Sequence, residues 1–114
     1  MQKILFTAIC AVVLLFGSCT KENTDPSIAD VDCSTVTFTE TIFPIFEQNC
    51  NTSGCHGGAS YNGTFTSYDA IKVIADNGKL KTQVLDQRTM PKGGSLTSEE
   101  LGQIKCWLDA GAPE

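Results

Sequence analysis

The sequence predicts a small helical domain, and two observations support this. Apolar residues recur at helical spacing in several segments, each bounded by residue types that start or stop helices. Strand signals are limited to two short runs, Val36–Phe38 and Thr64–Thr66. The chain has 114 residues, enough for one domain whose small core needs help from a disulfide, metal or cofactor.

The first helix is expected to begin at Thr39 or Thr41 and to run to about Asn49. Pro44 sets that start, because proline lacks a backbone N–H and is tolerated only in the first turn of a helix. The helix has a broad apolar face. This face is formed by Ile42, Phe43, Ile45 and Phe46.

A second helix is expected over residues 67–75, where Ser67 opens the segment and Asn77-Gly78 ends it. Residues 80–86 follow as a short turn or helix, and residues 87–96 are expected to form a loop.

The last helix is expected from Thr97 to about Ala110. Thr97 and Glu100 form a capping box, in which each side chain bonds the other residue's backbone N–H. Gly111 is suited to end the helix. The apolar stripe of this last helix consists of Leu101, Ile104 and Leu108.

The N-terminus resembles a bacterial lipoprotein signal over residues 1–18. Lys3 precedes an apolar run that is shorter than the roughly 20 residues of a membrane span. Leu15–Cys19 resembles a lipobox, so Cys19 is predicted to be lipidated, with a soluble export signal as the alternative. The protein is therefore expected to be exported and membrane-anchored, facing the periplasm or the cell surface.

Residues 19–32 are polar and are predicted to be a flexible tether, which leaves residues 33–114 as the folded domain. The chain has 13 acidic and 8 basic side chains, a net charge of −5. This balance argues against a nucleic-acid partner.

The run from Cys50 to His56 predicts a covalent haem site. Two thiols can react with the two vinyl groups of haem, and the adjacent imidazole can bind the iron. The usual signature is Cys-x-x-Cys-His, whereas four residues separate Cys50 from Cys55. Two alternatives stay open: a Cys50–Cys55 disulfide, and a zinc site that takes its fourth ligand from Cys33 or Cys106.

His56 is the chain's one histidine, and Met90 is its one methionine besides Met1. A haem with histidine and methionine ligands needs one of each. Met90 lies in the expected loop before Pro91, so it is predicted to bind the iron from the distal side.

These features together resemble the class I-type cytochrome c domains of exported bacterial proteins. The likeness covers about residues 36–113, with the attachment spacing and the lack of a proline between His56 and Met90 as departures. It is carried by Phe43–Phe46, Cys50–Gly58, Met90–Gly94 and Leu96–Pro113.

The resemblance implies an all-α, cytochrome c-like fold of three to five helices around one covalent haem c. Its N- and C-terminal helices cross beside the haem, with Phe43 or Phe46 packed against Trp107 or Leu108. If those helices touch, Cys33 and Cys106 could meet, and a disulfide between them is predicted. Two separate thiols are the alternative.

The expected function is single-electron transfer between redox-partner proteins, without enzymatic activity. One rival is a haem sensor or peroxidase-like protein with an open sixth position. Another is a disulfide-stapled or zinc-binding exported lipoprotein that only binds partners. Four basic residues near the expected haem loops could contact an acidic partner or a haem propionate. They are Lys79, Lys81, Arg88 and Lys92.

Overall fold

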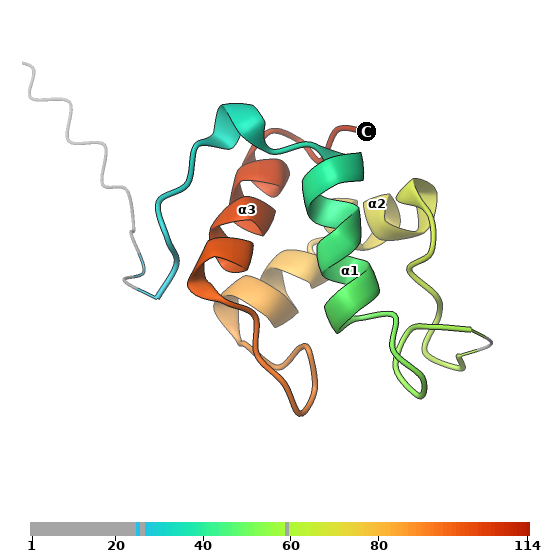
Figure 1. Cartoon of the computed structure of the whole chain (residues 1–114). Helices are drawn as coiled ribbons and strands as arrows, with labels where there is room; N and C mark the ends of the chain where they lie inside the picture. Colours follow the sequence, from blue (N-terminus) through green and yellow to red (C-terminus); the bar gives the residue numbers. More distant parts are fainter. Residues whose placement is uncertain (1–24, 26, 59) are drawn as a thin grey trace, which may run out of the picture.

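The computed structural model describes residues 25, 27–58 and 60–114. The predicted signal peptide and Cys19 lie outside these residues. The described chain contains no β-strand, which confirms the all-α prediction. None of its helices is both long and apolar enough to span a membrane. Figure 1 shows α1 (Phe43–Asn49), α2 (Tyr68–Asp76) and α3 (Ser98–Asp109), with three short helical segments, η1 (Cys33–Thr35), η2 (Phe38–Ile42) and η3 (Lys81–Asp86).

The first helical segment begins earlier than predicted, because η2 runs directly into α1. Its N-cap is Thr37, whose hydroxyl accepts a hydrogen bond from the Glu40 N–H at 3.3 Å. The start at Thr39 or Thr41 is therefore wrong. In η2 the turn is wide, and the Phe43 N–H bonds the Phe38 carbonyl five residues back. Helical structure thus precedes Pro44, which lies in the first turn of α1 as its missing N–H requires.

The predicted caps of the later helices are confirmed. Ser67 caps α2, and Asn77 ends it. Thr97 and Glu100 form the complete capping box of α3, with hydrogen bonds of 2.8 and 3.1 Å. Gly111 follows the end of α3 with a φ of 88°, a left-handed conformation that glycine adopts without steric cost.

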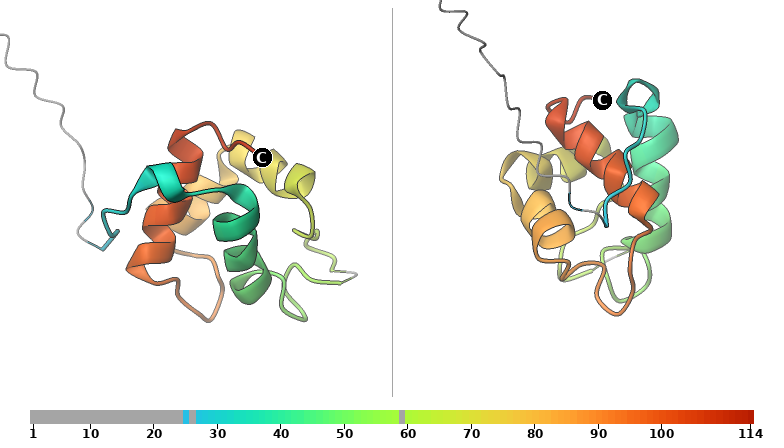
Figure 2. Two further views of the ribbon diagram at one scale, coloured as in Figure 1. Left: turned by 45° about the horizontal axis from the view of Figure 1, so that its top comes forward. Right: turned by 90° about the vertical axis from the view of Figure 1, so that its left-hand side faces the viewer.

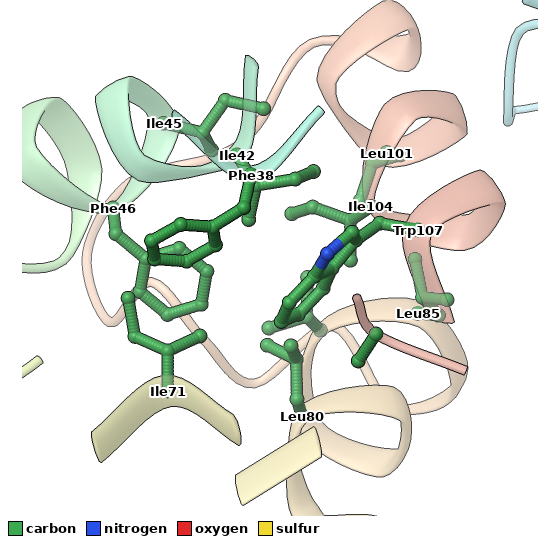
Figure 3. Packing of buried hydrophobic residues seen from close by; sticks show 12 residues of the cluster. Phe38, Ile42, Ile45, Phe46, Ile71, Leu80, Leu85, Leu101, Ile104 and Trp107 are labelled. Carbon is green, nitrogen blue, oxygen red and sulfur yellow. The ribbon is translucent and has the colours of Figure 1, made fainter. Parts of the chain in front are cut away.

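The hydrophobic core lies where η2 and α1 pack against α3, with side chains from α2 and η3 closing it (Figure 3). The ring paired with Trp107 is Phe38, with ring centroids 5.8 Å apart. Phe46 pairs edge-to-face with Phe65 at 5.8 Å. Phe46 and Trp107 belong to the same core cluster, and Phe43 and Leu108 pack against it, so Phe38 joins the residues predicted at this crossing.

A disulfide joins Cys33 to Cys106 with a Cα–Cα distance of 5.2 Å, and this prediction is confirmed. The chain before it runs alongside α3 (Figure 2). The Ala29 N–H donates to the Ser98 carbonyl at 2.9 Å. Gly102 permits this approach, because a Cβ there would overlap the Ala29 carbonyl oxygen and lie 3.1 Å from Val31 Cγ1. Part of the expected tether is therefore docked on the domain.

Candidate functional site

One cavity in the described part of the chain brings the four predicted haem residues together. It has a volume of about 470 Å³, within the usual range of about 300–1,000 Å³ for small-molecule and cofactor pockets. Cys50, Cys55, His56 and Met90 all line it, and apolar side chains supply most of the rest. The apolar lining consists of Phe46, Phe65, Ile74, Leu80, Val84 and Pro91.

One wall is the attachment loop, residues 50–58 and 60–65. It begins at the end of α1, where the Cys50 N–H still bonds the Phe46 carbonyl at 2.8 Å. The His56 N–H then donates back to the Cys50 carbonyl at 3.0 Å. That bond closes a loop over residues 51–55, so both cysteines border the same cavity in spite of the long spacing.

Two glycines make this loop possible. Gly54 has a φ of 82°, which side chains other than glycine adopt at a cost. A Cβ at Gly57 would overlap the backbone oxygen of Asn51. The Asn51 side chain adds a further tie, because its amide donates to the Phe65 carbonyl at 2.7 Å. The loop is therefore held by its own residues.

His56 is held in a single orientation. Its Nδ1 lies 3.2 Å from the Gly63 carbonyl oxygen. A carbonyl can only accept, so Nδ1 carries the proton and Nε2 keeps a free lone pair when the ring is neutral. Phe65 stacks on the imidazole, with centroids 4.1 Å apart and ring planes 23° apart. Neither Gly63 nor Phe65 was predicted as part of the site, although the Asn62-Gly63 turn signal could have located the carbonyl.

Cys50 and Cys55 are free, half-buried thiols. Burial, with smaller contributions from Cys55 and Glu100 nearby, raises the pKa of the Cys50 thiol to about 11. Cys50 is therefore protonated at neutral pH. The zinc alternative needed a ligand from Cys33 or Cys106, and the disulfide occupies both. No group of three or more histidine, cysteine or acidic side chains suited to a metal occurs within the described ranges.

Another part of the lining comes from the methionine loop, residues 87–96, which follows η3. The Gln83 carbonyl accepts hydrogen bonds from the Thr89 and Met90 N–H groups at 2.9 and 3.2 Å. Met90 packs against the hydrophobic core and is half-buried. Its thioether therefore comes from a different part of the chain to the same cavity as His56.

The cavity has a basic lining in an acidic protein. Its walls contain Lys79 and Lys92 and no aspartate or glutamate. Neither lysine forms an ion pair among the described residues, whereas Lys81 pairs with Asp86 at 2.8 Å and Arg88 pairs with Asp25 at 2.9 Å. Two of the four predicted basic residues thus belong to the cavity, and the arrangement suits a largely apolar ligand that carries negative charge.

Comparison with known proteins finds no matching family model, no similar curated protein and no similar solved structure. The function is therefore argued from the residues of this cavity.

Proposed function

We propose that this protein is a membrane-anchored c-type cytochrome that carries single electrons on one covalently bound haem. The observation that carries this proposal is that Cys50, Cys55, His56 and Met90 line one cavity. Met90 is far from the other three in sequence. A folded chain without a shared ligand has no need to gather two free thiols, an oriented imidazole and a thioether around one space.

The residues of the cavity fit haem c in chemical type. Each thiol would add across a vinyl group, so that a sulfur–carbon bond forms and the thiol hydrogen passes to the other vinyl carbon. No oxidant is needed for this addition. The closed loop over residues 51–55 brings both thiols to the same cavity, and the apolar walls would cover the porphyrin.

His56 and Met90 are the proposed iron ligands. The Gly63 carbonyl holds the His56 proton on Nδ1, which leaves Nε2 to bind the metal. Metal-binding histidines usually donate their other N–H to a carbonyl or carboxylate in this way. A methionine ligand would raise the reduction potential of the iron relative to harder ligands.

Lys79 and Lys92 are the proposed partners of the two haem propionates. Both line the cavity, and neither has a carboxylate partner within the described part of the chain. A charge-assisted hydrogen bond to a carboxylate would satisfy each ammonium group. These lysines would also offset the negative charge that the propionates bring.

When bound, haem supplies the one-electron chemistry, as its iron alternates between the ferrous and ferric states. The protein binds and orients the haem, and it acts as a carrier between redox proteins. Such encounters use small, weak interfaces. Cys19 would hold the carrier at a membrane through its lipid.

The test is to express the full chain in a bacterium with haem-attachment machinery and to measure its intact mass and its spectra. We expect the mass of one haem and a low-spin spectrum in both oxidation states. A Met90→Ala variant should keep the haem mass and gain a high-spin ferrous form that binds carbon monoxide. A folded, colourless protein of unmodified mass would rule out the haem and leave the binding-only lipoprotein. If the wild-type protein already binds carbon monoxide, the electron-carrier proposal gives way to a haem sensor or peroxidase-like protein with an open sixth position.

A further inference from the structure

We infer that Asp25, Ser27 and Arg88 form a clasp that positions Met90, so that the segment next to the predicted lipid anchor controls how firmly the distal ligand is held. This inference rests on the proposed function for its haem readout. Its structural basis does not depend on haem.

The clasp joins two parts of the chain that are distant in sequence. Arg88 Nη2 donates to Asp25 Oδ2 and to Ser27 Oγ, each at 2.9 Å. Ser27 in turn donates from its hydroxyl and its backbone N–H to Asp25 Oδ1 at 2.6 and 2.9 Å. The guanidinium therefore meets an organised acceptor pair rather than one flexible side chain.

Arg88 also determines the path of the methionine loop. Its Nε donates to the Leu85 carbonyl at 2.8 Å, which fixes the side chain against η3. Its φ is 54°, a left-handed conformation that residues other than glycine adopt only when their surroundings hold them there. Directly after this turn, Thr89 and Met90 bond the Gln83 carbonyl. Arg88, the residue held by the clasp, is therefore also the residue at which the chain turns back toward the cavity.

The other end of the clasp is also anchored. Ile28 packs against the core, and the Ala29 N–H bonds the first residue of α3. Asp25 therefore cannot follow Arg88 freely if the methionine loop moves. Since Cys19 lies only a few residues before Asp25, the chain around Asp25 connects the predicted membrane anchor to the methionine loop.

Asp25→Asn is the most informative variant, because it weakens the clasp without substituting any residue of the methionine loop. Arg88→Gln removes the clasp from the other side, and Arg88→Lys should restore part of it. Lys81→Gln is the matched control, since it removes one positive charge and one exposed ion pair from η3. Arg88 and Asp25 are positioning residues and touch no proposed ligand atom.

Two readouts separate this inference from the haem proposal. In the haem-free protein, amide exchange at Thr89 and Met90 should become about three- to tenfold faster in Asp25→Asn and Arg88→Gln, as expected when a partly exposed charged hydrogen-bond pair is lost. In the haem-loaded protein, the ferric iron–methionine charge-transfer band should weaken and ferrous carbon monoxide binding should accelerate. The Lys81→Gln control should match the wild type in both.

Wild-type exchange rates at Thr89 and Met90 in Asp25→Asn and Arg88→Gln would overturn the clasp, whatever the haem result. Faster exchange with an unchanged charge-transfer band would show a clasp that does not act on the ligand, and would also overturn the inference. Failure of every variant to take up haem would count against the haem proposal alone, because the exchange measurement needs none.

Discussion

The two walls of the cavity are held in place in different ways. The attachment loop, with His56, is fixed by bonds among its own residues, such as those from His56 to Cys50 and to Gly63. The methionine loop is fixed in part by a contact with Asp25, at the far end of the described chain. A local motif therefore builds the attachment-loop wall, whereas the methionine-loop wall depends on tertiary structure.

The largest effect should come from removing the disulfide, which supports the remote contacts. It joins residues 73 positions apart, and a bridge of this span stabilises by about 4 kcal/mol in the chain-entropy model. A Cys33→Ser, Cys106→Ala double variant should lose about that much unfolding free energy in a urea titration. Amide exchange should accelerate more in residues 27–36 and the methionine loop than in the attachment loop, and equal acceleration of both would contradict the contrast.

A substitution at Gly57 should distort the attachment loop and leave the methionine loop unchanged. Alanine there would force the Asn51 backbone to move, at about 3 kcal/mol, which is the upper end for overpacking. Gly58→Ala is the control, because a Cβ at that position meets nothing within 4 Å and costs only about 1 kcal/mol for its left-handed φ. Chemical-shift changes in Gly57→Ala should reach His56 and leave Met90 unchanged. Equal destabilisation by the two alanines would contradict the close packing.

The raised pKa of Cys50 offers a test of how well the attachment loop shields this thiol from solvent in the haem-free protein. A rise from 9.0 to about 11 lowers the thiolate fraction at pH 8 about a hundredfold, so iodoacetamide should modify Cys50 about a hundredfold more slowly in the folded than in the denatured chain. Since the folded pKa is the higher one, the stability from this group is full below pH 9.0 and is lost as pH rises toward 11. Equal rates in both states would mean that the thiol is open to solvent.

The smallest effect should come from protonation of Asp25 at low pH, which weakens its contact with the methionine loop. Hydrogen bonds from Ser27, with the charge of Arg88, lower the pKa of Asp25 below 3.8. A lowered carboxyl pKa stabilises the fold above the unfolded value, and this stabilisation is lost as pH falls through the folded value. The protection factor of the Met90 amide should therefore fall as pH drops below about 3.8 in the wild type, and less in Asp25→Asn. The same pH dependence of Met90 protection in the two proteins would contradict a role for Asp25 in holding the methionine loop.

The same contrast explains what could be predicted from sequence. The capping box at Thr97, the end of α2 at Asn77 and the all-α class follow from local residue patterns, and these predictions are confirmed. The start of η2 could not be predicted from Pro44, because a wide turn let helical structure begin before it. The pairing of Phe38, in η2, with Trp107 was not predicted either.

The site divides in the same way. Cys50, Cys55 and His56 were found from their local spacing, and Met90 from its scarcity in the chain. Gly63 contributes a backbone carbonyl, which any residue possesses, so the Asn62-Gly63 turn was the one signal that could have located it. Asp25 and Arg88 are ordinary charged residues whose pairing depends on how the N-terminal segment docks on α3.

The most direct test of the central claim is peptide mapping of the protein made with haem-attachment machinery. The peptide spanning Cys50 to His56 should carry one haem through two thioethers, with neither thiol available to alkylation. Cys50→Ser and Cys55→Ser should each reduce this to a single thioether. A wild-type peptide with two free thiols, or with a Cys50–Cys55 disulfide, from a properly folded and exported protein would contradict the cytochrome assignment.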